Sequence, residues 1–226
     1  MDPKEYLAIR KAYNSMRQDK DQDNRLTFEE FAILSILYDK DYLTATEIAE
    51  FQKVSRPTMT HRGNHLEKLE LITRTPGVND RRQVCCAITP LGKEDVEKQL
   101  KELLTHLPKE IAASFGRGKA ASENLRKQII EMGTQEILAG SLTLFAFGLF
   151  SDEQEVTITD IVDSTSLLQP TVSMSVARLE RAGLLSRQRG SATSRRTTLV
   201  SVTEEGQSEL DDMLSTVSDM KVVHSK

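Results

Sequence analysis

Two sets of polar and basic side chains, about 113 residues apart, carry the clearest chemical signal in this sequence. In the first set His61, Asn64 and His65 recur at helical spacing, and such groups can bond the edges of nucleic-acid bases. Each set ends in a pair of arginines, whose guanidinium groups suit phosphates and a narrow minor groove. Residues 53–82 hold seven Lys or Arg against three acids, and residues 169–196 hold six against one, although the chain carries −4 overall. Binding to a polyanion requires such a local basic patch.

The two sets belong to one duplicated segment. Residues 57–74 align with residues 170–187 without a gap, and six of these 18 positions are identical. Self-similarity on this scale indicates a whole domain present in two copies. The 226 residues then divide into two domains of ordinary size. We expect them at residues 1–115 and 116–226.

The pattern within each copy predicts the elements that position these side chains. A short helix (46–50 or 159–163) is followed by a turn and by a second helix with proline in its first turn, where the missing N–H costs little. An alternating stretch, residues 82–88 in the first copy, follows turn-forming residues and predicts a β-hairpin. Helix, turn, helix and hairpin is the winged helix-turn-helix order. The expected fold is mainly α with small β-hairpin wings.

These segments resemble the MarR family of transcriptional regulators. The resemblance rests on five stretches in the same order, namely 46–50, 55–60, 66–72, 80–82 and 88–92. The second copy is similar but weaker: Leu168 and Gln169 replace Ser55 and Arg56 at the helix entry, and its wing lacks an aspartate.

The resemblance implies a covalent pseudo-dimer. MarR proteins pair through terminal helices and place two recognition helices in successive major grooves of DNA, and tandem members of the related Sar branch carry both halves in one chain. Here the helices expected at 2–17, 91–113, 122–132 and 204–220 would form a bundle between the domains. We therefore expect a monomeric, sequence-specific regulator on an imperfect inverted repeat of double-stranded DNA, with a homodimer left open.

We predict DNA contacts from both second helices, their entries and both wings. The predicted contact residues are Ser55, Arg56, Thr58, Thr60, His61, Asn64, His65, Arg81, Arg82, Gln169, Thr171, Ser173, Met174, Arg178, Arg189, Arg195 and Arg196. By resemblance, Asp80 would orient a neighbouring arginine. Arg62 stands where the family has an apolar residue, so that it would either contact phosphate or lie along the helix. The alternative for all of these residues is a solvated charged surface.

An acidic loop offers a different function. Residues 19–30 match a calcium-binding loop with oxygen ligands at Asp19, Asp21, Asp23 and Glu30, except for Asn24 in place of glycine. The loop is single, and Thr27 with Glu30 also predicts an ordinary capping box at a helix start. The alternative function is therefore a protein-interaction or calcium-responsive module.

Other classes of function find little support. The four histidines are scattered, no Ser or Cys has a base at a recognisable spacing, and there is no glycine-rich phosphate loop, so we expect neither an enzyme nor a cofactor. His61 and His65 lack a third metal ligand nearby. Adjacent Cys85 and Cys86 on a strand should face opposite sides, one in the core, with nothing nearby except Arg82 to favour a reactive thiolate.

Hydropathy predicts a cytoplasmic protein without a membrane segment. No apolar run approaches about 18 residues, and the N-terminus lacks the apolar core of a signal peptide. Residues 142–150 carry no charge and are too short to span a bilayer, which predicts a buried helix. The resemblance also implies a small aromatic effector, for which Phe31, Phe145 and Phe147 are candidate lining residues.

Overall fold

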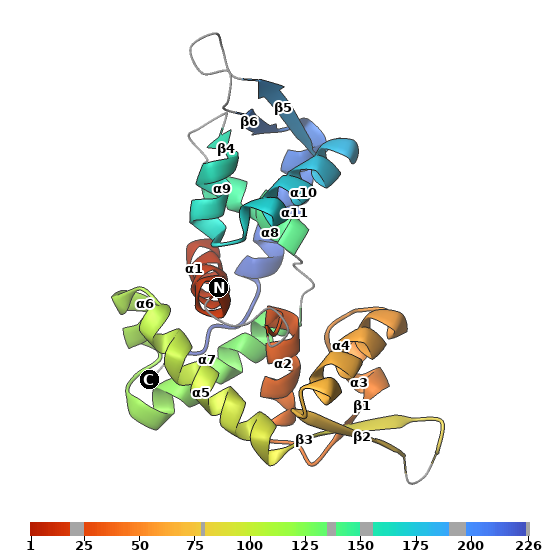
Figure 1. Cartoon of the computed structure of the whole chain (residues 1–226). Helices are drawn as coiled ribbons and strands as arrows, with labels where there is room; N and C mark the ends of the chain where they lie inside the picture. The colour runs from red at the N-terminus through yellow and green to blue at the C-terminus, as the bar shows by residue number, and fades with distance from the viewer. Residues whose placement is uncertain (19–24, 78–79, 135–138, 150–155, 190–197, 225–226) are drawn as a thin grey trace. The chain divides into compact units, whose positions relative to one another are not determined.

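The computed structural model describes residues 1–18, 25–77, 80–134, 139–149, 156–189 and 198–224 (Figure 1). The chain forms two compact units, each containing one copy of the repeat. What we call the first unit comprises residues 16–136 and 221–226, and the second unit comprises residues 1–15 and 137–220. Each unit thus combines segments far apart in the sequence. The domain boundary expected at residue 115 concerns the duplicated sequence and stays a prediction.

The first unit contains a helix-turn-helix, its wing and four further helices among the described residues. Its elements are α2 (Phe28–Leu37), β1 (Leu43–Thr44), α3 (Ala45–Phe51), α4 (Arg56–Lys68), β2 (Ile72–Pro76), β3 (Val84–Ile88), α5 (Pro90–His106), α6 (Lys109–Ser114) and α7 (Gly118–Gly133). The strands form an antiparallel sheet of order β1-β3-β2, with Leu43 and Arg74 on either side of Cys86.

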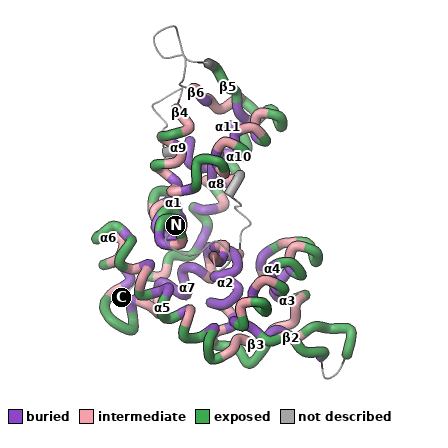
Figure 2. The backbone as a smooth tube through the Cα atoms, in the orientation of Figure 1, coloured by how far each residue is buried: buried purple, intermediate pink, exposed green. Residues whose placement is uncertain are grey.

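Helix α2 forms the centre of the first unit. It contacts α5, α7 and β3, and nine of its ten residues are buried (Figure 2). A helix that is apolar around its whole circumference is stable only inside a core. The capping box predicted at its start is confirmed: the Thr27 hydroxyl accepts from the Glu30 backbone, and the Glu30 carboxylate accepts from Thr27.

The second unit repeats the winged-helix topology. Its elements are α8 (Ala139–Phe145), the 3-10 helix η2 (Ala146–Leu149), β4 (Val156–Thr157), α9 (Ile158–Thr165), α10 (Gln169–Arg181), β5 (Leu185–Arg189), β6 (Thr198–Val202) and α11 (Glu204–Ser218). The strand order β4-β6-β5 corresponds to β1-β3-β2. The buried helix predicted at 142–150 is confirmed for residues 142–147, of which all six are buried, while Phe150 lies outside the described residues.

The N-terminal helix α1 (Pro3–Gln18) supplies core residues to the second unit through its first thirteen positions. Tyr6 is fully buried and its ring centroid lies 5.3 Å from that of Phe145. Asn14 Nδ2 donates to the carbonyl oxygen of Thr165, at the end of α9, over 3.0 Å. A segment of about fifteen residues at the beginning of the chain is thus part of the C-terminal winged helix.

The two copies share the backbone features that their turns require. Lys53 and Ser166, at equivalent positions between the helices of each helix-turn-helix, have φ of 53° and 49°, a left-handed conformation that non-glycine residues adopt rarely. At the helix after each wing, a Cβ on Gly92 would lie 2.2 Å from the Leu71 carbonyl oxygen, and one on Gly206 would lie 2.0 Å from that of Leu184. No other residue fits so close to backbone, which explains why both glycines recur.

The expected long helices are mostly present, with one exception. The ranges 2–17, 122–132 and 204–220 correspond to α1, α7 and α11, although α7 begins earlier, at Gly118. The single helix expected over 91–113 is wrong, because α5 ends at His106 and α6 begins at Lys109. Pro108 disfavours helical geometry in the residue before it, and Leu107 is extended, with ψ of 148°. A bundle between the two domains stays a prediction.

Candidate nucleic-acid interface

Helix α4 separates an apolar inner face from a polar outer one. Ser55 caps its start, and Ser55 Oγ lies 2.9 Å from Thr58 Oγ1. Met59, Gly63 and Leu66 face the interior. The exposed positions among the predicted contacts on this helix and its entry are Ser55, Arg56, Thr60, His61 and Asn64, whereas Thr58 and His65 are half-buried. The polar outer face predicted from the 3.6-residue period is therefore present, with His65 as a special case.

Arg62 lies inside the helix-turn-helix. It is 7% exposed, and its Nη1 donates to Gln52 Oε1 over 2.8 Å. Gln52 Nε2 in turn donates to the Glu29 carbonyl oxygen over 2.7 Å. These bonds connect α4 to the end of α3 and to α2. Arg62 therefore holds α4 in place from its buried side. It neither faces outward to contact phosphate nor lies along the helix surface, the two alternatives predicted from the sequence.

His65 is bonded to a buried carboxylate. Its Nδ1 lies 2.8 Å from Glu30 Oε1, and the Glu30 side chain is 3% exposed while that of His65 is 26% exposed. Since a carboxylate only accepts, His65 donates from Nδ1, and only Nε2 is left for a base contact.

The calcium-binding alternative gains no support from the same geometry. Both oxygens of Glu30 already accept hydrogen bonds, Oε2 from Thr27 and Oε1 from His65. The remaining proposed ligands, Asp19, Asp21 and Asp23, lie outside the described residues. Within the part of the chain that the structure describes, no three His, Cys, Asp or Glu side chains gather as a metal site, His61 and His65 included.

Arg74, on β2, ties the wing to the outer face of α4. Its Nη2 donates to Asn64 Oδ1 over 2.6 Å, and its Nε donates to Glu67 Oε2 over 2.9 Å. Gly63 leaves room for this arrangement, since a Cβ there would lie 3.3 Å from Arg74 Nη1. The sequence analysis missed this contact. The signal available was the shared arginine at the end of both repeats, together with the shared glutamate seven residues before it.

Helix α10 presents a different outer face. Val172, Val176 and Leu179 are buried, whereas Gln169, Met174 and Arg178 are exposed, Met174 to 73%. Of the remaining predicted contacts, Thr171 and Ser173 are half-buried. Leu168 occupies the N-cap and offers no side-chain hydrogen bond, unlike Ser55.

The second copy keeps the arginine–glutamate pair. Arg187 Nε donates to Glu180 Oε2 over 2.6 Å, and its Nη2 bonds the same oxygen. The hydrogen bond from Arg187 holds the pKa of Glu180 below its ordinary value. Position 177, equivalent to Asn64, is alanine, so this arginine has no amide to hold.

The first wing exposes its arginines around a tight turn. Asp80 Oδ1 accepts from the backbone N–H of Arg82 over 2.9 Å, and the Gln83 N–H donates to the Asp80 carbonyl. Asp80 therefore acts on Arg82 through the backbone, and both Arg81 and Arg82 are exposed. A groove of about 630 Å³ between the wing and the helix-turn-helix is lined by Arg56, Thr60 and Arg82, among others.

The second wing is only partly described. Arg195 and Arg196 lie outside the described residues, and so does the side chain of Arg189, whose backbone belongs to β5. Their contacts with DNA stay predictions.

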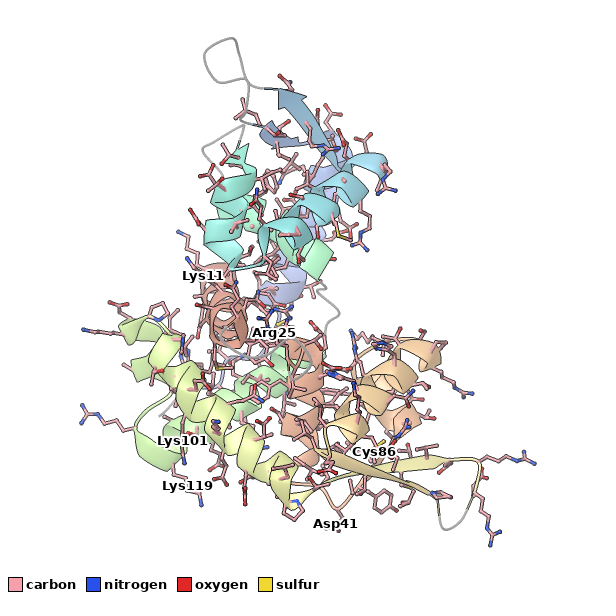
Figure 3. All side chains as sticks on the ribbon, viewed as in Figure 1. Lys11, Arg25, Asp41, Cys86, Lys101 and Lys119 are labelled. Atoms are coloured by element: carbon pink, nitrogen blue, oxygen red, sulfur yellow. The ribbon has the colours of Figure 1, made fainter. Side chains whose placement is uncertain are left out.

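The two cysteines divide as the strand pattern predicts. Cys86, on β3, is fully buried, and burial raises the pKa of its thiol to about 11 (Figure 3). Cys85 is partly exposed. A thiol held protonated at neutral pH is a poor nucleophile, so Cys86 serves as a core residue.

An open groove of about 870 Å³ lies in the first unit between the end of α2, α5 and α7. Tyr38 lies at its base, with the Arg126 Cζ 4.8 Å from the ring centroid. Tyr38 donates its hydroxyl hydrogen to Glu97 Oε1 over 2.5 Å, and Arg126 pairs with Asp39. Lys101 and Lys119 add positive charge from α5 and α7 (Figure 3).

The phenylalanines expected to line an effector site do not line this groove. Phe31, Phe145 and Phe147 are buried, at 0%, 1% and 7% exposure. They were chosen because they are apolar and aromatic, and side chains of that type are mostly buried in the core. The available signal for Arg126 was an arginine at helical spacing among apolar residues of α7 such as Leu125 and Ile129.

Comparison with known proteins agrees with this geometry. Residues 26–84 match the MarR family, and residues 148–206 match a winged helix DNA-binding domain. No curated protein matches the chain.

In the part of the chain that the structure describes, no helix is both long and apolar enough to cross a bilayer.

Several solved structures are similar to parts of this chain. A MepR-like protein crystallised with pseudoligands shares 26% identity over 53% of this chain and 82% of its own, with a TM-score of 0.35. YusO from Bacillus subtilis shares 26% identity over 40% of this chain and 61% of its own (TM-score 0.33). BpsR from Bordetella bronchiseptica shares 23% over 34% and 58% (TM-score 0.31). This chain thus spans about three fifths of the length of the last two. The chain therefore contains a first domain that matches the MarR family and a second winged helix DNA-binding domain.

Proposed function

We propose that this protein is a sequence-specific transcriptional regulator whose two winged helices read the two halves of an imperfect inverted repeat. The observation that carries the proposal is the presence of two complete winged helix-turn-helix folds in one chain. Strand order, the left-handed residue in the turn, and the arginine–glutamate pair recur in both copies. A single chain then supplies the two heads for which helix-turn-helix proteins otherwise dimerise.

The first head combines base-reading and phosphate-binding groups. His61 and Asn64 are exposed on α4 and offer hydrogen bonds to base edges in the major groove. Arg56 lies at the helix entry and Arg82 on the wing, and both are exposed and suited to phosphate contacts. The groove between them is also lined by Glu47, Glu50 and Asp80, so the contacts would come from the two arginines at its edges and not from the groove itself. Arg81, at the tip of the wing, would contact phosphate or the minor groove.

The second head reads fewer base edges. Met174 and Ala177 offer apolar contact to a thymine methyl but no hydrogen bond. Arg178 is exposed beside them and is suited to phosphate or guanine. We therefore propose that one half of the operator is strictly specified and the other half tolerates changes.

A small aromatic acid remains part of the proposal as an effector. The open groove in the first unit is lined by Tyr38, by three basic side chains (Lys101, Lys119 and Arg126) and by three acidic ones (Asp39, Glu97 and Glu123). The carboxylate of the effector would bind beside Lys101 and Lys119, because Arg126 already pairs with Asp39. BpsR is a protein whose DNA binding is regulated by 6-hydroxynicotinic acid.

Selection of bound fragments from a random DNA pool, followed by footprinting, tests the function. We expect one chain per duplex to protect two half-sites about 10 base pairs apart, or a multiple of that spacing. The stoichiometry is measured by the mass of the complex. Protection of a single half-site by the intact chain, or two chains on each operator, would overturn the pseudo-dimer. DNA binding that appears only with added calcium would favour the acidic-loop alternative.

A further inference from the structure

Asn64 is held by Arg74 in one orientation of its side-chain amide. Arg74 Nη2 lies 2.6 Å from the Asn64 atom it contacts, and Arg74 is itself fixed by the bond from its Nε to Glu67. A guanidinium group has donors and no acceptor, so the Asn64 atom facing Arg74 is the carbonyl oxygen. The amide NH₂ of Asn64 therefore points away from Arg74 and presents two donors.

The orientation of the amide determines which base edge can form hydrogen bonds with Asn64. In the major groove, a free asparagine reads adenine by accepting from N6 and donating to N7, which requires both of its polar atoms. Arg74 takes one of the two lone pairs of the Asn64 oxygen and fixes the direction that this oxygen faces, which leaves the NH₂ as the end of the amide that Arg74 does not occupy. Guanine presents two adjacent acceptors, N7 and O6, and no donor at that edge.

We propose that Arg74 is a specificity-determining residue: it presents Asn64 to DNA as a donor, so that the base opposite Asn64 in the operator is guanine rather than adenine. This inference rests on the proposed function. Arg74 acts as a positioning residue, because it lies on the wing strand β2 and works through the amide of α4. Glu67 contributes by anchoring the guanidinium, and Gly63 by leaving space beside it.

The second copy provides the matched comparison. Arg187 occupies the place of Arg74 and makes the same pair with Glu180, but alanine stands at position 177. Replacing Arg187 therefore removes the same ion pair from the equivalent strand, but no asparagine side chain loses a hydrogen bond. Both pairs are partly exposed, with Arg74 and Glu67 at 24% and 42% and Arg187 and Glu180 at 36% and 34%, so neither loss should unfold its unit.

The experiment compares binding sites selected from a random pool by the full-length chain and three variants. Asn64→Ala identifies the operator position that Asn64 reads, as the position whose preference disappears. In Arg74→Met, the side chain keeps its apolar stem but donates nothing, and we expect the preference for guanine over adenine at that position to fall about tenfold. Arg187→Met should change no base preference. Thermal unfolding of each variant monitors the fold.

The outcomes separate the inference from the proposed function. A wild-type chain that selects no common sequence would overturn both. A clear operator with adenine opposite Asn64, or a guanine preference that Arg74→Met leaves unchanged, would overturn the inference alone. A fourth variant, Asn64→Asp, can only accept and retains a partner for Arg74. If Asn64 acts as a donor, this variant should lose the guanine preference about tenfold without a fall in thermal stability.

Discussion

The two helix-turn-helix segments have the same backbone and different polar contacts. Thr44 and Thr157 cap their first helices with complete capping boxes, and both turns hold a left-handed residue. The first segment adds the chain of bonds from Arg62 to Gln52 and on to Glu29. At the positions equivalent to Arg62 and Gln52, the second segment has Ser175 and Thr165, and the Thr165 carbonyl is held by Asn14 of α1.

After the duplication, both copies kept the left-handed turn residue and the glycine that lies against backbone. The polar side chains that hold each helix-turn-helix in place differ between the copies. The first recognition helix is supported by neighbours within its own repeat. In the second segment, a helix from the other end of the chain bonds the first helix of the pair instead, through Asn14 and Thr165 at the end of α9. Each of these contacts can be removed without touching the other.

The largest effect should come from Tyr6→Ala. Removing a fully buried aromatic ring costs about 3 to 5 kcal/mol, and here the loss should fall on the second unit. Hydrogen exchange should show α9 and α10 losing protection while α3 and α4 keep theirs. Lys11→Ala, an exposed position on the same helix, serves as the control. Loss of protection in α3 and α4 instead would contradict the assignment of α1.

Arg62→Met should destabilise the first unit by about 1 to 3 kcal/mol, because it leaves Gln52 Oε1 buried without its donor. The equivalent change in the second copy, Ser175→Ala, should cost less than that. Denaturant unfolding of both variants gives the comparison. Equal costs would mean that the polar chain behind α4 adds nothing to the support of that helix.

The wings can be compared by their salt dependence. Replacing Arg81 and Arg82 by alanine should weaken binding to all sequences and make the slope of log K against log salt shallower by about one to two units. The same measurement on Arg195→Ala with Arg196→Ala asks whether the second wing contributes equally. An unchanged slope in either pair would show that the wing concerned does not touch phosphate.

The smallest effects should come from the two capping threonines, and they should be equal in the two copies. Thr44→Ala and Thr157→Ala should each cost about 1 kcal/mol at neutral pH, because each removes a helix cap. Hydrogen bonds from Thr44 and Thr157 lower the pKa of Glu47 and Asp160, so the carboxylates stabilise the fold above their ordinary pKa values of 4.5 and 3.8. That stability is lost as the pH falls through the lowered pKa. The difference between each variant and the wild type should therefore shrink in acid, and a constant difference would argue against the capping carboxylates.

Local patterns predicted the fold well, whereas the polar contacts of the site depended on distant partners. Caps, prolines and alternation lie within a few residues of the elements they specify, and the winged-helix order followed from them. His65 bonds Glu30 across 35 residues, and Asn14 bonds Thr165 across 151. Spacing along the chain carries no sign of such pairs. For the same reason His65 and Asn64 were both read as plain outward side chains, although each is oriented by another residue.

The interleaving of the two units has a consequence for the order in which they can be completed. Residues 1–15 leave the ribosome before their partners between residues 137 and 220 are made. The first unit can form most of its core from residues 16–136 before the second unit is complete. During that time Tyr6 and Leu7, which are buried in the folded protein, lack the residues that bury them. Contacts of such large sequence separation form slowly. In refolding followed by pulse-labelling, protection of α9 and α10 should therefore appear after that of α3 and α4, so that the chain acquires its first reading head before its second.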